Sequence, residues 1–187
     1  MAHSSATSIT ARPSDAERPP RAGLYTPAER ARRDATRWTL VQGVLAPVQF
    51  LVCLASVALI VRALATGEGL WLANASVVLK AVLLLIIMVT GAIWEKVVFG
   101  RWLFAPAFFW EDVVSMGVIA LHLAYVAALL GGWLAPTALL GLALAAYAAY
   151  AVNAAQFVWK LRQARLSAPA SASVPSAASV PSAGVPA

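Results

Sequence analysis

The chain has 187 residues, of which 61% are hydrophobic and only 12% are charged, and its mean hydropathy is +0.76. Soluble domains contain about 45–50% apolar and about 25% charged residues, so this composition excludes an ordinary soluble domain. The net charge of +6 could indicate a nucleic-acid ligand. However, the basic residues gather beside apolar runs, where such residues orient membrane proteins and contact anionic lipid headgroups. We therefore expect an integral membrane protein that binds no nucleic acid.

The N-terminal arm, residues 1–23, is rich in serine, alanine, proline and arginine. It lacks the apolar core of roughly 7–15 residues that a signal peptide requires, and its composition predicts disorder. Next, Thr26, Pro27 and Glu29 form the pattern of a capping box with proline at the first helical position. We predict a short basic helix over about 27–35 that lies on the membrane surface.

Four apolar runs follow, and each is long enough for a membrane-spanning helix of about 20 residues. They cover approximately residues 38–61, 71–94, 111–131 and 136–159. Tryptophans stand close to most of their ends, as expected for rings at the level of the lipid headgroups. The second run contains Lys80, whose long side chain we expect to extend outward to the headgroups.

The C-terminal stretch, residues 167–187, repeats Ser-Val-Pro-Ser-Ala without any charge, which predicts a disordered tail. The single cysteine, Cys53, lies within an apolar run, and the sequence contains no spacing of cysteine and histidine that is typical of a metal site. The predicted fold is all-α: residues 24–166 form a four-helix transmembrane bundle that is preceded by one short interfacial helix.

The distribution of basic residues predicts the orientation of the bundle. Twelve of them precede the first span, lie between the second and third spans, or follow the fourth, whereas only Arg62 lies in the other two connections. Lysine and arginine accumulate on the cytoplasmic side. We therefore expect a multi-pass membrane protein with both termini in the cytoplasm.

The connection between the second and third spans is unusual, because residues 94–112 contain seven aromatic and five charged residues. The spans alternate in direction, so polar residues from three spans converge at this cytoplasmic level. They are Glu95, Lys96, Glu111, Asp112, Asn153 and Gln156. His122 lies on the same face of its helix as Glu111, and a rise of 1.5 Å per residue places it about 16 Å deeper.

Each of these residues also has a purely structural interpretation. Carboxylates at the ends of spans can be solvated or can favour a helix N-terminus. Lys96 and Arg101 can anchor the chain at the headgroups. His122, Asn153 and Gln156 can form interhelical hydrogen bonds. The convergence of acids, amides and rings favours a functional site, and its composition suits either acid–base chemistry on a flat lipophilic ring system or the binding of one.

Four segments of the sequence resemble the vinyl bacteriochlorophyllide hydratases of purple phototrophic bacteria. They are LYTPAERARRDATRWTLVQGVLAPVQFLV, MVTGAIWEKVVFG, LFAPAFFWEDVVS and VNAAQFVWKLR. The resemblance covers about residues 24–166 and implies a hydro-lyase of the bacterial inner membrane. Such an enzyme adds water to the ring-A vinyl group of chlorophyllide a, or of a related vinyl bacteriochlorophyllide, and forms a 1-hydroxyethyl group. This reaction is redox-neutral, so we expect no cofactor.

Hydration requires one group that delivers a proton to the vinyl group and another that directs water to the neighbouring carbon. The residues predicted for these steps are Glu95 or Glu111 as the acid, Asp112 or His122 as the group that orients the water, and Asn153 and Gln156 as the groups that hold it. His122 has a competing role as an axial ligand of the magnesium in the substrate.

The remaining predicted contacts bind the substrate. Four rings would stack on the macrocycle: Trp94, Phe108, Phe109 and Trp110. One base, Lys96 or Arg101, would pair with the free propionate. The alternative function is a non-catalytic chlorin carrier or photosystem assembly factor with the same pocket. The preferred vinylchlorin stays open at this point, as do self-association and contact with neighbouring enzymes of the pathway.

Overall fold

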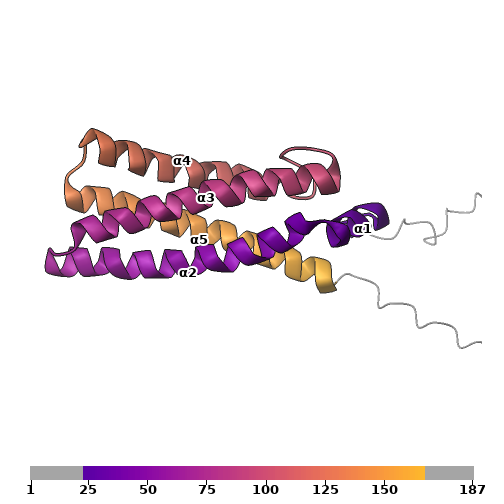
Figure 1. Ribbon diagram of the computed structural model, residues 1–187, viewed down its shortest axis with the longest axis horizontal. Helices are drawn as coiled ribbons and strands as arrows, with labels where there is room; N and C mark the ends of the chain where they lie inside the picture. Colours follow the sequence, from indigo (N-terminus) through magenta and orange to yellow (C-terminus); the bar gives the residue numbers. More distant parts are fainter. Residues whose placement is uncertain (1–22, 167–187) are drawn as a thin grey trace, which may run out of the picture.

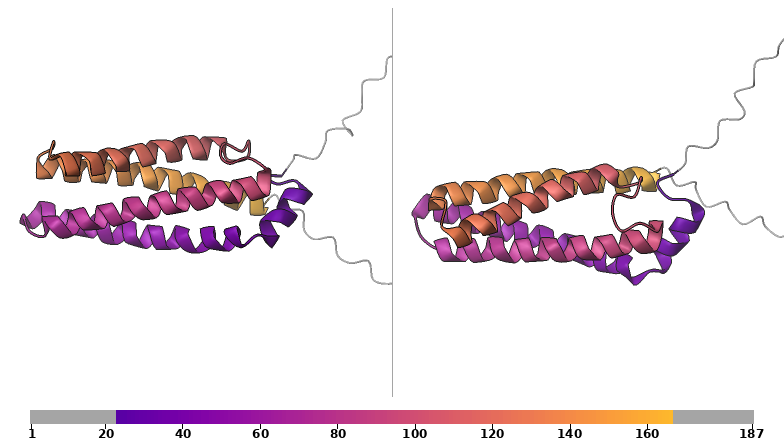
Figure 2. Two further views of the ribbon diagram at one scale, coloured as in Figure 1. Left: turned by 45° about the horizontal axis from the view of Figure 1, so that its top comes forward. Right: turned by 90° about the horizontal axis from the view of Figure 1, so that it is seen from above.

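The computed structural model describes residues 23–166, which form five helices and no strand within that range (Figure 1). The helices are α1 (Pro27–Ala35), α2 (Arg37–Thr66), α3 (Leu70–Phe99), α4 (Phe109–Gly131) and α5 (Pro136–Leu166). The tails predicted over 1–22 and 167–187 lie outside the described residues. The helices α2 to α5 lie side by side, while α1, the end of α5 and the connection from α3 to α4 meet at one end of the bundle (Figures 1 and 2).

The first helix has the predicted bounds because its start is encoded locally. The Thr26 backbone N–H donates to Oε2 of Glu29 over 2.8 Å, and the Glu29 N–H donates to Oγ1 of Thr26 over 3.3 Å. These two bonds are the reciprocal contacts of a capping box. The helix rests on the end of α3, where Nε of Arg32 donates to the Val98 carbonyl over 2.8 Å.

The four long helices match the predicted spans and confirm an all-α membrane bundle, since each is long and apolar enough to cross a bilayer. Three of them extend further than the apolar runs predict. The first span helix, α2, continues to Thr66, and α5 continues to Leu166. The helix α3 continues to Phe99, so Glu95 lies within it. Backbone hydrogen bonding does not stop where the apolar run stops, and α3 ends only at Gly100, whose left-handed φ of 78° is readily adopted by glycine.

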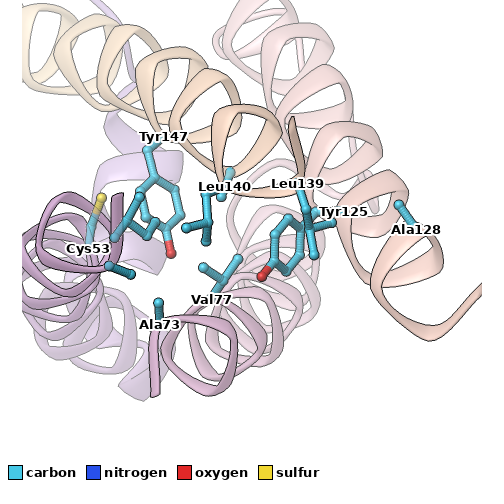
Figure 3. Packing of buried hydrophobic residues seen from close by; sticks show 11 residues of the cluster. Cys53, Ala73, Val77, Tyr125, Ala128, Leu139, Leu140 and Tyr147 are labelled. Atoms are coloured by element: carbon cyan, nitrogen blue, oxygen red, sulfur yellow. The ribbon is translucent and has the colours of Figure 1, made fainter. Parts of the chain in front are cut away.

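The bundle consists of two helical hairpins. Within each hairpin the helices pack along one another, α2 with α3 and α4 with α5, whereas the two hairpins meet over a smaller area. Their shared core is built from residues of all four helices, including Cys53, Val77, Tyr125, Leu140 and Tyr147 (Figure 3). Two interior hydroxyl contacts join the hairpins: Oγ of Ser56 lies 2.7 Å from the Tyr147 hydroxyl, and the Tyr125 hydroxyl donates to Oδ1 of Asn74 over 2.8 Å.

The expectation that Lys80 extends outward is wrong. Its side chain is fully buried and donates to Oε1 of Gln49, and its Nζ atom lies 3.5 Å from the centroid of the Tyr150 ring. The reason is helix rotation: Lys80 shares its face of α3 with the buried residues Val77 and Leu84, because positions three and four apart align on one side of a helix.

Candidate active site

Two buried carboxyl groups meet where the hairpins are joined. Glu95 lies in the last turns of α3 and Asp112 in the first turn of α4, and only 5% and 4% of their surfaces are exposed. The connection between these helices closes over both groups: the Phe104 N–H donates to Oδ2 of Asp112 over 2.8 Å, and the Ala105 N–H donates to Oε2 of Glu95 over 3.1 Å. The two carboxyl groups also lie within hydrogen-bonding range of one another.

The backbone of this connection is shaped around the acids. Phe104 has a φ of 57°, and it is the only non-glycine residue with positive φ among residues 23–166. A left-handed conformation is rare for an aromatic residue and costs on the order of 1 kcal/mol. The adjacent Ala105 is fully buried. The contacts of both N–H groups with carboxyl oxygens offset the strain, so the loop and the acids hold one another in place.

Glu111 has a different partner from its neighbour Asp112. Its Oε2 atom lies 2.5 Å from Nζ of Lys160 on α5, and this contact is a partly buried ion pair. The Lys160 ammonium also lies 5.2 Å from the centroid of the Phe108 ring. Sequence reasoning missed Lys160 as a site residue, because its partner lies 49 positions earlier in the chain and nothing local links the two.

The seam between α4 and α5 continues the polar site into the bundle. Nδ2 of Asn153 donates to Oγ of Ser115 over 2.8 Å, and this hydroxyl donates to the Glu111 carbonyl over 2.8 Å. The Oδ1 atom of Asn153 and the Oε1 atom of Gln156 are buried without a hydrogen-bond partner. Unsatisfied buried acceptors are uncommon and mark positions where water or a ligand binds.

The structure separates the predicted aromatic residues into two groups. Phe108 is buried and stacks on Phe157 with a centroid distance of 5.9 Å and an interplanar angle of 21°, and Trp94 meets Phe108 edge-on at 5.7 Å. Tyr25 joins this inner cluster beside Phe99. Burial raises the pKa of the Tyr25 hydroxyl above its ordinary value, so this group is neutral at physiological pH.

The second group of rings faces outward. Phe109 and Trp110 pack edge-on with centroids 5.4 Å apart, Phe109 also contacts Phe104 at 5.8 Å, and 70% of the Trp110 surface is exposed. These three rings lie on or beside the loop that covers Glu95 and Asp112. Sequence reasoning missed Tyr25 and Phe157 in the inner cluster, although Tyr25 directly precedes the capping residue Thr26, a position from which apolar side chains commonly pack.

Three predicted residues do not reach the carboxyl pair. Lys96 and Arg101 are exposed, and Nζ of Lys96 donates to the Gly100 carbonyl over 3.0 Å. His122 is buried in α4, and its Nδ1 atom lies 2.8 Å from the Val118 carbonyl. Ten residues separate His122 from Asp112, which corresponds to about 15 Å along the helix. The structure thus brings together Glu95 and Asp112 but leaves His122 near the middle of the bundle.

These observations define a class: a multi-pass, all-α membrane protein with a buried carboxyl pair beneath a strained loop and beside exposed rings. A family model described as 2-vinyl bacteriochlorophyllide hydratase matches residues 25–163. Two curated relatives with this name come from Cereibacter sphaeroides and Rhodobacter capsulatus. The first is 64% identical over 153 residues, covering 81% of this chain and 94% of the relative. The second is 62% identical over 156 residues, covering 83% and 91%.

The chain belongs to the 2-vinyl bacteriochlorophyllide hydratase family. It is therefore a hydratase, an enzyme of the hydro-lyase class, in the bacteriochlorophyll biosynthesis of photosynthetic bacteria. No solved structure matches the chain.

Proposed function

We propose that this enzyme adds water to the ring-A vinyl group of chlorophyllide a, or of a closely related vinyl bacteriochlorophyllide, and forms a 1-hydroxyethyl group. The observation that carries the proposal is the pair of Glu95 and Asp112, two buried carboxyl groups in mutual contact. The names of the two curated relatives support the substrate class. The cluster of basic residues at this end of the bundle supports its placement on the cytoplasmic side of the inner membrane.

The first step uses the proton that the pair shares. Two adjacent buried carboxyl groups cannot both be ionised without a large electrostatic cost, so one carries a proton and the other does not. In the proposed step Glu95 transfers this proton to the terminal CH₂ of the vinyl group. The π electrons form the new C–H bond, and a positive charge remains on the carbon beside the macrocycle, which delocalises it.

The second step captures water. A water oxygen forms a bond to the cationic carbon, and the water loses one proton to the carboxylate of the pair. The pair then holds one proton again, and the substrate has gained one molecule of water without oxidation or reduction. The free acceptor atom of Asn153 or of Gln156 is suited to hold the water by accepting a hydrogen bond from one of its O–H groups. The other O–H is left for the carboxylate that takes the proton.

The contacts favour Glu95 over Glu111 as the acid. The Glu111 carboxylate forms an ion pair with Lys160 and does not take part in the carboxyl pair. Asp112 is the second member of the pair, whereas His122 lies too deep to orient a water at this level. Among the predicted stacking residues, Phe109 and Trp110 are exposed and available to a ligand, whereas Trp94 and Phe108 pack against one another in the inner cluster.

The test is turnover in membranes of a non-phototrophic host that expresses the chain. Incubation with chlorophyllide a should give a product that is heavier by one water and blue-shifted, because hydration removes the vinyl group from conjugation. Glu95→Gln should lower the rate at least about a hundredfold while pigment binding persists. The matched control is Glu68→Gln, since Glu68 is exposed at the opposite end of the bundle. Pigment binding by the unaltered chain without any turnover would contradict the proposal and indicate a carrier.

A further inference from the structure

A second polar centre lies between the two hairpins, away from the carboxyl pair. Each of the four long helices contributes one residue to it: Gln49 from α2, Lys80 from α3, His122 from α4 and Tyr150 from α5. The chemistry proposed above uses none of these residues. Ionisable groups in the interior of a membrane bundle are costly, and they generally mark function.

Lys80 is a buried base without an acidic partner. Its surface is 0% exposed, its Nζ atom contacts Gln49 and the Tyr150 ring, and no carboxylate within residues 23–166 forms an ion pair with it. An amide oxygen and a ring face solvate an ammonium only partly, and a buried charge requires a counter-charge. The centre therefore lacks an anion.

His122 supplies an unused lone pair to the same centre. A backbone carbonyl can only accept, so the contact between Nδ1 of His122 and the Val118 oxygen requires the proton on Nδ1. The Nε2 atom then carries a free lone pair, and it is buried without a partner in a side chain that is 1% exposed. A histidine whose other ring N–H is held by a carbonyl has the arrangement that metal ligands adopt.

The two unsatisfied groups lie against neighbouring rings of α5. The Lys80 Nζ atom lies 3.5 Å from the centroid of the Tyr150 ring, and the His122 ring centroid lies 5.7 Å from that of Tyr147. Tyr147 and Tyr150 are three residues apart and share one side of their helix. Because the hairpins meet over less area than the helices within each hairpin, a flat ligand can separate them at lower cost than it could split either hairpin. The tyrosine rings provide apolar walls for such a ligand.

We propose that this centre binds the macrocycle of a magnesium tetrapyrrole that carries a free carboxylate. His122 Nε2 donates its lone pair to the open axial position of the magnesium, and the Lys80 ammonium pairs with the carboxylate. No electron is transferred in either contact. The inference rests on the proposed function, because the vinyl chlorophyllide substrate has both a magnesium ion and a free propionate. In this arrangement Lys80, rather than Lys96 or Arg101, pairs with that propionate.

The test compares ligand preferences in purified full-length protein. Chlorophyllide a is titrated beside its magnesium-free form and beside its propionate methyl ester, and binding is followed by absorbance. The unaltered protein should bind chlorophyllide a at least about tenfold more tightly than either analogue, where tenfold corresponds to 1.4 kcal/mol. Equal binding of all three ligands by the unaltered protein overturns the proposal, and this result requires no variant.

Two variants should each remove a different preference. His122→Leu should lose the preference for magnesium and keep the preference for the free acid, while Lys80→Met should show the reverse. Damage to the fold alone would weaken the binding of all three ligands equally and leave both preferences unchanged. His122→Gly should regain the magnesium preference on addition of imidazole. The proposal is overturned if folded His122→Leu keeps the preference for magnesium and folded Lys80→Met keeps the preference for the free acid.

Exposed bases provide the matched controls. Arg62→Met removes a positive charge at the opposite end of the bundle and should leave both preferences intact. Loss of the acid preference in Lys96→Met or Arg101→Met, together with its retention in Lys80→Met, contradicts the inference. Turnover of the unaltered protein is measured separately. If the protein hydrates chlorophyllide a but shows neither ligand preference, only this inference is rejected. If it shows both ligand preferences but no hydration, only the proposed function is rejected.

Discussion

The two polar regions of this bundle differ in how far their groups are satisfied. At the end of the bundle, Glu95 and Asp112 contact one another and accept two backbone N–H groups. In the centre, Lys80 has no anionic partner and His122 has an unused nitrogen. The two proposals assign the proton transfer to the satisfied carboxyl pair and ligand binding to the unsatisfied centre.

The largest effect should come from the satisfied region. Glu95→Gln and Asp112→Asn should each lower hydration by about 10²–10⁴-fold, and the double variant should be little worse than either single one. Residues that act as a unit show such non-additivity. Rates of the two single variants and the double variant, measured with chlorophyllide a, check this. Effects that multiply would show that the two acids act independently.

The aromatic residues offer a second contrast at the same end. Phe157→Ala removes a ring from the inner cluster and should lower the free energy of unfolding by about 3–5 kcal/mol. Trp110→Ala removes an exposed ring and should instead weaken pigment binding by about 0.5–1.5 kcal/mol. Thermal unfolding and pigment titration of both variants distinguish the two roles. A large stability loss in Trp110→Ala would place that ring in the core.

Opposite changes of stability should distinguish the buried Lys80 from the partly buried Lys160. Without ligand, Lys80→Met removes an unpaired interior charge and should stabilise the protein by about 1 kcal/mol or more. Lys160→Met leaves Glu111 without its partner and should be destabilising by a similar amount. Unfolding in detergent, followed by tryptophan fluorescence, measures both. Destabilisation by Lys80→Met would mean that Gln49 and Tyr150 already satisfy the ammonium.

The smallest effect should be at the first helix. Thr26→Ala removes the capping side chain and should destabilise α1 by about 1 kcal/mol. Hydrogen exchange over 27–35 should then be faster, with no change around Lys80. Thr66→Ala, at the opposite end of α2, is a control that should leave α1 unaffected. Faster exchange throughout the bundle would show that docking of α1 supports the whole fold.

Local signals predicted the fold well. The capping box of Thr26 and Glu29 predicted the bounds of α1, and the apolar runs predicted four spans, because both signals reside in contiguous sequence. The inward face of each span could not be predicted in the same way, since these helices are apolar all round. Lys80 was therefore assigned to the wrong side.

The candidate site was predicted only as a set of residues at one level. Sequence position brings Glu95, Glu111 and Asp112 together, but it does not say which two acids pair. That choice depends on Lys160, which reaches Glu111 from a distant helix. Adjacent rings diverge for a similar reason: Phe108 turns inward to Phe157 while Phe109 faces outward. Such differences depend on helix rotation and on tertiary partners, which no local pattern encodes.

The loop over 100–108 is the chain segment that joins the two hairpins. Glu95 belongs to one hairpin and Asp112 to the other, and the loop N–H groups hold both acids. If a flat pigment separates the hairpins as proposed, it would also displace this loop and move the two acids apart. On the proposed mechanism, pigment binding and exposure of the Glu95 proton would therefore occur together, and the proton would be shielded from bulk water until the vinyl group is in place.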